Sequence, residues 1–168
     1  KDIIRGGNMK KNKLTAFVLI MLLALSPVAY AFGTVAATNP GYEQRVVQLV
    51  NIERQKAGLD PLYYDSKISD VARVKSKDMA DLNYFDHYSP TYGMANNMLR
   101  RFGINYSFWG ENIAMGQDTP EIVVSQWMNS PSHRKNILSP YYTFIGVGYY
   151  VDTDGTPYWT QLFTSDDK

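Results

Sequence analysis

Residues 144–163 read FIGVGYYVDTDGTPYWTQLF, and this stretch decides the fold class. Two runs rich in β-branched and aromatic residues, 144–151 and 158–163, enclose a polar segment that contains Asp154-Gly155, and this pattern predicts a β-hairpin. Gly146 and Gly148 stand at alternate positions of the first run. One face of that strand therefore has room for a closely packed neighbour.

The segments upstream of the hairpin have helical periodicity. The expected helices cover residues 42–56, 66–82, 94–102 and 120–128. Asp65 or Ser66 can cap the second helix, which repeats Ile68, Val71, Ala72, Lys75, Met79 and Leu82 at three- and four-residue spacing. Thr119 and Pro120 supply the fourth helix with a cap and a first-turn proline. Helices followed by an antiparallel hairpin predict a layered α+β domain, and not a parallel βαβ sheet.

The amino-terminal segment predicts a targeting signal. Basic residues in 9–13 precede an uncharged, mostly apolar run of about 12 residues, which is shorter than the roughly 20 that span a bilayer as a helix. Ala29-Tyr30-Ala31 matches a small-residue cleavage pattern, and a second such pattern ends at Ala37. We expect a secretory signal peptide over residues 9–31, with an uncleaved signal anchor as the alternative. Residues 1–8 fit no part of a signal peptide, and we interpret them as a leader or non-native extension.

The rest of the chain predicts one secreted domain. We expect a short flexible linker over residues 32–41, a single domain over residues 42–163 and a frayed polar tail over residues 164–168. Removal of residues 1–31 leaves 12 basic and 15 acidic residues, and no Lys/Arg patch that favours nucleic acid. We expect a monomer with no membrane span after removal of the signal. The absence of cysteine excludes a disulfide framework and thiolate chemistry.

The only two histidines of the chain, His87 and His133, lie in Ser/Pro-rich segments on either side of a Gly110-Glu111-Asn112 motif. Imidazole and carboxylate groups bind metals and transfer protons near neutral pH. Three such residues from separate elements are what a three-ligand metal site needs, and equally what a hydrogen-bonded structural cluster needs. No His-Glu-x-x-His helix is present, so a zinc peptidase of that type is not indicated.

A serine nucleophile has weaker support. Ser89 lies two residues from His87, but no Gly-x-Ser-x-Gly elbow surrounds it. Turn formation explains Ser89-Pro90 and Ser130-Pro131 better. We expect Trp127 and Trp159 to be core residues and not ligand platforms.

Seven short motifs occur in order along residues 42–163. They are Asn51-x-x-Arg54, Gly58-Leu59-x-Pro61-Leu62, Asp86-His87-x-Ser89-Pro90, Gly110-Glu111-Asn112-Ile113-Ala114, Trp127-Met128-Asn129-Ser130-Pro131-x-His133-Arg134-x-Asn136-Ile137-Leu138, Ile145-Gly146-Val147-Gly148 and Tyr158-Trp159-Thr160-Gln161-x-Phe163. Together they resemble bacterial secreted proteins of the CAP superfamily, which carry the SCP/PR-1-like domain. The resemblance implies an α-β-α sandwich with a central antiparallel sheet, in agreement with the helices and hairpin expected above.

The same resemblance implies a cleft lined by two histidines and acidic residues, which holds a divalent ion in some family members. The metal-ligand candidates are His87, Glu111 and His133, the further cleft candidates are Asn112, Ser130 and Asn136, and the catalytic candidates are Glu111, His87, His133 and Ser89. Eukaryotic members place a glutamate where this chain has Ser130. At most a three-residue site is therefore carried over, and zinc is its favoured ion.

Four functional hypotheses follow from these residues. The leading one is a secreted binding module, outside the cell or at its envelope, whose cleft takes a divalent metal and a lipid, glycan or peptide ligand. The alternative is a metal-assisted extracellular hydrolase that uses the same cleft. In a third, both histidines are structural and satisfy backbone groups at turns. A fourth, lipid binding, is motivated by Phe102, Tyr106, Phe108 and Trp109.

Overall fold

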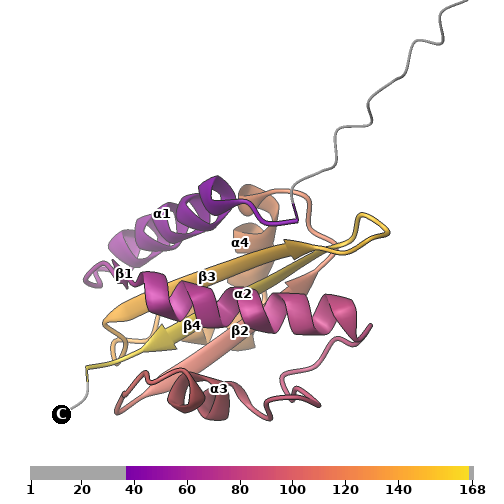
Figure 1. Ribbon diagram of the computed structural model, residues 1–168. Helices are drawn as coiled ribbons and strands as arrows, with labels where there is room; N and C mark the ends of the chain where they lie inside the picture. Colours follow the sequence, from indigo (N-terminus) through magenta and orange to yellow (C-terminus); the bar gives the residue numbers. More distant parts are fainter. Residues whose placement is uncertain (1–36, 167–168) are drawn as a thin grey trace, which may run out of the picture. The chain divides into compact units, whose positions relative to one another are not determined.

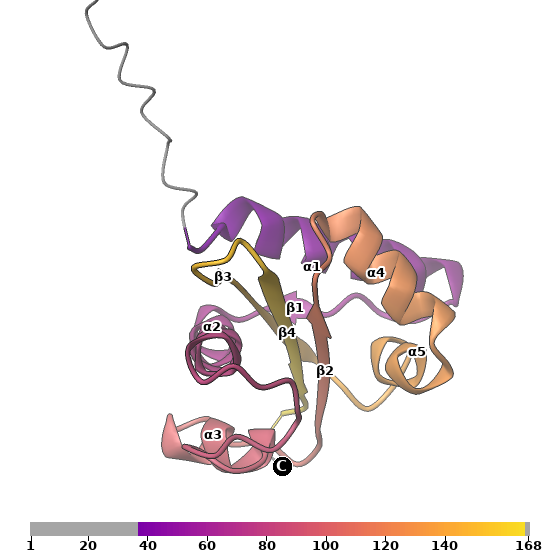
Figure 2. The ribbon, with the colours of Figure 1, turned by 90° about the vertical axis from the view of Figure 1, so that its right-hand side faces the viewer.

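The computed structural model describes residues 37–166, and the predicted signal peptide lies outside these residues. The elements are α1 (Pro40–Lys56), β1 (Tyr63–Tyr64), α2 (Ser66–Asp81), α3 (Ala95–Arg101), β2 (Trp109–Met115), α4 (Pro120–Asn129), α5 (Pro131–Ile137), β3 (Phe144–Val151) and β4 (Pro157–Thr164). The four strands form one sheet in the order β1-β3-β4-β2. Figures 1 and 2 show α2 and α3 on one face of this sheet and α1, α4 and α5 on the other. This is the expected α-β-α sandwich.

The predicted hairpin forms the centre of the sheet. β3 pairs antiparallel with β4, with Ile145 opposite Phe163, and β2 pairs antiparallel with the other side of β4. β1 adds only two residues, parallel to β3. The sheet is therefore antiparallel except at this short edge. All eight residues of β4 are buried, because helices cover both faces of the sheet.

Helix α2 lies directly against β3, as the two alternate glycines predicted. A Cβ atom on Gly146 would lie 2.4 Å from the carbonyl carbon of Ile68, and one on Gly148 would lie 2.2 Å from the carbonyl carbon of Ala72. The Ser76 hydroxyl donates to the Gly148 carbonyl over 3.1 Å. The backbones of helix and strand thus approach to a distance that no side chain on these two glycines would permit.

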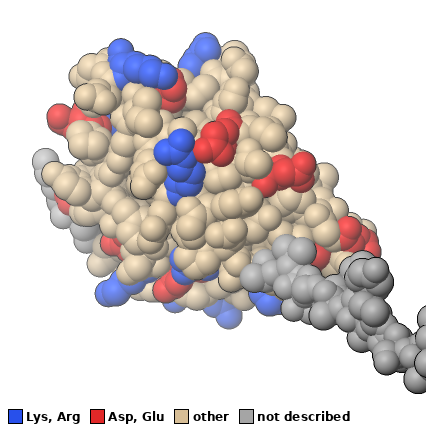
Figure 3. Space-filling view, turned by 90° about the horizontal axis from the view of Figure 1, so that it is seen from above, with Lys and Arg blue, Asp and Glu red and all other residues tan. Residues whose placement is uncertain are grey.

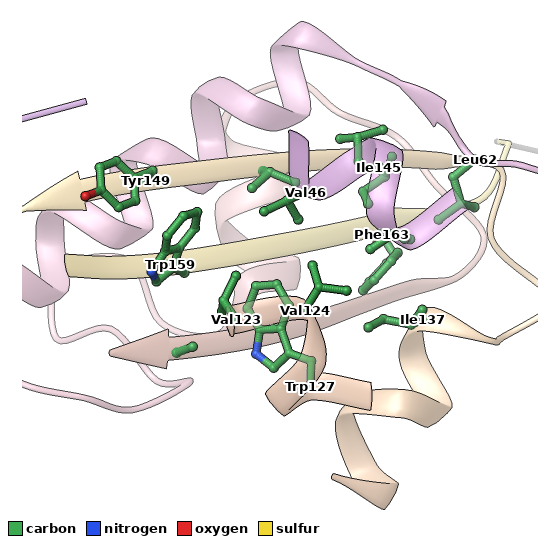
Figure 4. Packing of buried hydrophobic residues seen from close by; sticks show 14 residues of the cluster. Val46, Leu62, Val123, Val124, Trp127, Ile137, Ile145, Tyr149, Trp159 and Phe163 are labelled. Carbon is green, nitrogen blue, oxygen red and sulfur yellow. The ribbon is translucent and has the colours of Figure 1, made fainter. Parts of the chain in front are cut away.

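The larger core cluster lies on the opposite face, between the sheet and α1, α4 and α5 (Figure 4). Trp127 and Trp159 are buried members of this cluster, which confirms their expected role. Their indole N–H groups donate to the carbonyls of Ile113 (3.2 Å) and Gln117 (2.8 Å). Each tryptophan therefore buries a large apolar surface and also satisfies its one polar group.

The helix ends follow the capping residues. The Asn39 side chain accepts a hydrogen bond from the Tyr42 N–H, so α1 begins at Pro40, two residues earlier than expected. Asp65, and not Ser66, caps α2 with its side chain. The other bounds of α2, α3 and α4 lie within one residue of the expected ones.

Residues at both ends of the domain make hydrogen bonds to it. Ala37 was placed in a flexible linker, yet its carbonyl accepts a hydrogen bond from the Val151 N–H over 2.9 Å. Ser165 was placed in a frayed tail, yet it is buried and its N–H donates to the Phe108 carbonyl over 3.0 Å. The folded unit therefore extends beyond residues 42–163 on both sides.

Charged side chains are scattered over the face seen in Figure 3, with Lys and Arg lying among Asp, Glu and uncharged residues. The ion pairs include Arg45 with Glu121 at 2.8 Å and Arg73 with the buried Glu43 at 2.5 Å. This face therefore has no single-sign patch of the kind that nucleic acid requires. Along residues 37–166, no helix combines the length and the apolar character that crossing a membrane requires.

Candidate functional site

The structure brings His87 and Glu111 into direct contact. Nδ1 of His87 lies 2.6 Å from Oε1 of Glu111. The histidine side chain is 47% exposed and the glutamate side chain only 2% exposed. The hydrogen bond to Glu111 raises the pKa of His87, although partial burial of the ring opposes this shift. A buried carboxylate thus orients an exposed imidazole and leaves Nε2 as the ring nitrogen available to a ligand.

His133 lies near this pair and comes from a different element. Burial lowers the pKa of His133, and the charge of His87 lowers it further. The two imidazoles therefore favour opposite protonation states, His87 the charged one and His133 the neutral one. A turn was expected at Ser130-Pro131, but the structure has a short helix there, α5, which contains His133. Pro131 occupies the first position of this helix, and its fixed φ suits that position.

Strand β2 carries Glu111, and its free edge is held by side chains instead of a further strand. The donors are Tyr142 Oη to the Trp109 carbonyl (2.9 Å), Asn136 Nδ2 to the Glu111 carbonyl (3.0 Å) and Trp127 Nε1 to the Ile113 carbonyl (3.2 Å). A Cβ atom on Gly110 would lie 2.5 Å from Tyr142 Oη, so a larger residue here would displace the Tyr142 side chain. These contacts protect the edge strand and fix the backbone position from which Glu111 projects.

A buried amide network lies behind the His87–Glu111 pair. Asn136 Nδ2 donates to Asn112 Oδ1 over 2.8 Å, and Asn112 Nδ2 donates to Gln161 Oε1 over 2.9 Å and to the His133 carbonyl over 3.2 Å. The predicted cleft candidates Asn112 and Asn136 therefore connect β2 with α5 and position the site. Gln161 was not predicted as part of it. The sequence did offer one signal for Gln161, because a polar amide stands among the apolar residues of a predicted strand.

Lys75 on α2 supports the loop that carries His87. Its side chain is buried, and Nζ donates to the carbonyls of Asp86 (2.7 Å) and His87 (3.1 Å). Burial lowers the pKa of Lys75, while the negative charge of Glu111 opposes this shift. Helical spacing had placed Lys75 on the buried face of α2, but it had given the residue no role. A buried lysine needs polar partners, and here the partners are backbone carbonyls of the loop that carries His87.

The catalytic candidate Ser89 has a structural position. It is buried, and its hydroxyl donates to Asp78 Oδ2 over 2.7 Å and accepts the N–H groups of Thr91 (3.0 Å) and Tyr92 (2.9 Å). The hydroxyl is therefore fully used in closing a turn. This arrangement supports the turn interpretation of Ser89 and gives no support to a nucleophile.

The predicted three-ligand metal site is not assembled. Among residues 37–166, no three His, Asp or Glu side chains form a group that could hold a metal ion. Oε1 of Glu111 is bonded to Nδ1 of His87, so the carboxylate is the hydrogen-bond partner of this imidazole. Ser130 lies at the junction of α4 and α5, with its Oγ 3.2 Å from that of Ser132.

The sequence matches known proteins over most of the described domain. Residues 47–163 match the family model described as CAP, the cysteine-rich secretory protein family. The chain is 58% identical over 122 residues to the uncharacterized protein YkwD of Bacillus subtilis (strain 168), a match that covers 73% of this chain and 46% of that protein. The chain spans less than half the length of the curated relatives that it matches, 46% and 34%.

Solved structures give the same result. An extracellular protein containing a SCP domain from Bacillus anthracis str. Ames superposes with a TM-score of 0.69 at 38% identity, covering 75% of this chain and 41% of that one. NaASP2, crystallised with Zn²⁺, has the same fold, with a TM-score of 0.57 at 13% identity over 77% of this chain and 82% of that one. The motifs, the sandwich and these matches agree, and the chain belongs to the CAP family of cysteine-rich secretory proteins.

Proposed function

We propose that this protein is an extracellular binding module, and that its ligand site is built on His87, Glu111 and His133. The observation that carries the proposal is the 2.6 Å hydrogen bond by which buried Glu111 orients exposed His87. A histidine that served only the core would be buried and would bond to backbone groups. The predicted signal peptide and the extracellular relative from Bacillus anthracis support a place outside the cell or at its envelope.

The divalent ion that suits this site best is zinc, with His87 and His133 as its protein ligands. A zinc-bound histidine usually donates its other ring N–H to a carboxylate, which fixes the ring and increases its basicity. Oε1 of Glu111 can accept such a hydrogen bond from the Nδ1–H of His87. Zinc would supply a Lewis acid for an anionic or carbonyl group of the ligand. That NaASP2 was crystallised with Zn²⁺ supports trying this ion first.

A calorimetric zinc titration of the metal-free protein tests the proposal. We expect saturable one-to-one binding that is lost in the His87→Ala/His133→Ala variant. Glu111→Gln should weaken binding by about 10- to 100-fold, because the amide keeps the shape but removes the charge that supports His87. Ser130→Ala is the matched control, and it should leave the affinity unchanged.

Zinc binding that persists in the double histidine variant would place the ion elsewhere and contradict the assignment. Thermal unfolding of His87→Ala separates the proposal from a purely structural role of the histidines. We expect a small change in Tm, because the side chain is nearly half exposed. A large fall in Tm, together with no zinc binding by the wild-type protein, would favour the structural role.

A second candidate function is metal-assisted hydrolysis at the same site. It is favoured by one observation, a buried carboxylate that holds an exposed imidazole as in general-base catalysis. If the protein hydrolyses esters or amides, Glu111→Gln should reduce kcat by roughly 10³- to 10⁴-fold without unfolding, because the imidazole then loses its orientation and its charge partner. Turnover that continues in this variant and in excess chelator would remove the hypothesis.

A further inference from the structure

An exposed aromatic pair, which we call the aromatic shelf, lies on the surface apart from the histidines. Phe108 and Tyr141 stack with ring centroids 5.2 Å apart and an interplanar angle of 30°. They are 52% and 65% exposed. Phe108 precedes β2 and Tyr141 follows α5, so the fold brings together two distant segments to make a surface that the core does not use. A stacked and exposed aromatic pair offers a flat apolar surface to a ligand.

The aromatic shelf separates two hollows in the surface. The first has a volume of about 430 Å³ and lies along α5 between Pro131 and Tyr142. The second has a volume of about 320 Å³ and is lined by Phe108, Thr143, Ser165 and the carboxylate of Asp166. Pro140 and Tyr141 border both hollows. A ligand that crosses Tyr141 would therefore lie on an aromatic face between the two hollows, and the carboxylate of Asp166 would keep anionic groups out of the second one.

The first hollow is positively charged. Arg134 and Lys135 line it, both are exposed, and no Asp or Glu contributes to its lining. Within the described part of the chain, no carboxylate forms an ion pair with either residue. The Arg134 side chain donates to the Met128 carbonyl over 3.1 Å, which holds the guanidinium against the protein while other N–H groups stay available. The charge of this hollow therefore favours an anionic ligand.

The same hollow also has hydrogen-bonding side chains beside its aromatic wall. Asn136 and Ser139 line it together with Tyr142. A flat apolar wall, neutral polar groups and two cations match a sugar ring, which has an apolar C–H face, hydroxyl groups at its rim and, in acidic glycans, a charged substituent. A membrane surface would require a protruding apolar patch, and nucleic acid would require many more cations than two.

We propose that the aromatic shelf and the hollow along α5 bind an acidic glycan. Tyr141 stacks against a sugar ring, Phe108 supports Tyr141 from behind, and Arg134 and Lys135 bind the carboxylate, phosphate or sulfate groups of the chain. Neither His87 nor His133 lines the hollow. The hollow therefore contains neither proposed zinc ligand, although Asn136 lines it and also donates to the Glu111 carbonyl.

The test measures binding of the full-length protein to three oligosaccharides of equal length, namely oligogalacturonate, heparin oligosaccharide and neutral maltooligosaccharide. We expect saturable binding of at least one acidic oligomer and much weaker binding of the neutral one. Tyr141→Ala should weaken acidic binding by about tenfold or more, as the loss of a stacking platform does in other ligand grooves. Arg134→Gln/Lys135→Gln should weaken it and reduce its dependence on salt.

Two matched controls separate a built site from nonspecific attraction. Arg100→Gln/Arg101→Gln removes the same charge from α3, and Tyr88→Ala removes a tyrosine that is 59% exposed in another loop. Both control variants should bind the acidic oligomers as tightly as the wild-type protein does. The His87→Ala/His133→Ala variant should also bind them with wild-type affinity, whether or not it binds zinc.

Three results would overturn the glycan proposal. The first is no binding of either acidic oligomer, including the case in which only anionic lipid vesicles bind. The second is equal weakening by the α3 charge control and the Arg134/Lys135 variant. The third is unchanged affinity of a folded Tyr141→Ala variant.

Discussion

Gly148→Ala is expected to destabilise the protein by about 3 kcal/mol or more, because the new methyl group has no space. Its Cβ would lie 2.2 Å from both the carbonyl carbon of Ala72 and the nitrogen of Arg73. These are backbone atoms in the middle of α2, so no side chain can rotate away. The helix itself must move off β3, which disrupts the core cluster that contains Ile68 and Ala72.

Urea unfolding measures this effect, with Gly103→Ala as the matched control. Gly103 has a φ of +76° and nothing within 4 Å of its ideal Cβ, so alanine there costs only backbone strain of about 1–2 kcal/mol. We expect Gly148→Ala to unfold at a clearly lower urea concentration than Gly103→Ala. Equal or smaller destabilisation by Gly148→Ala would contradict the close approach of α2 to β3.

Lys75→Met is expected to lower the free energy of unfolding by about 2–3 kcal/mol and to loosen the site. Methionine fills a similar volume but cannot donate to the carbonyls of Asp86 and His87, and hydrogen bonds from charged donors contribute about 1.5–3 kcal/mol. The loop that positions His87 then loses its attachment to α2. Zinc affinity should therefore fall in this variant, although Lys75 touches no proposed ligand atom.

Lys67→Met on the exposed side of α2 is the control, and it should change stability by less than about 0.5 kcal/mol. Denaturant unfolding and the zinc titration are run on both variants. A Lys75→Met protein with wild-type stability and wild-type zinc affinity would show that the buried lysine does not hold the loop.

The hairpin of β3 and β4 and the long helices were predictable from the sequence because their signals are local, whereas strands β1 and β2 were not predicted. The alternate glycines of β3, the β-rich runs on either side of Asp154-Gly155 and the cap at Asp65 each act within a few residues. Helix α5 was missed because seven residues are too few to be stable alone. Its stability comes from tertiary contacts, namely burial of Ile137 in the core and the hydrogen bonds of Asn136 to β2.

The sequence named three residues that lie near one another in the fold, but it did not give their arrangement. His87, His133 and Glu111 were named from motifs, and the structure places His87 and Glu111 in contact with His133 nearby. Glu111 was expected as a metal ligand, whereas its hydrogen bond to Nδ1 makes it a partner of His87. The supporting residues Lys75 and Gln161 were not found, because burial of a polar side chain depends on which elements pack over it. That information is absent from helical or strand spacing.

The pKa shifts of the two histidines have opposite consequences for stability. The raised pKa of His87 adds stability that is fully present below its unfolded-state pKa of about 6.5 and is lost as the pH rises through the folded-state value. The lowered pKa of His133 does the reverse, since protonation of the folded protein is disfavoured and stability falls as the pH drops below about 6.5. The two effects oppose each other in unfolding data, so each histidine has to be observed separately.

NMR titration of the two imidazoles in the metal-free protein tests the central claim most directly, because the chain contains only these two histidines and His133→Ala assigns them. We predict that His87 titrates above and His133 below the ordinary pKa of about 6.5, and that Glu111→Gln lowers the pKa of His87 and brings the two values together. Two histidines that titrate together near 6.5, with no response to Glu111→Gln, would contradict a site built on the His87–Glu111 pair.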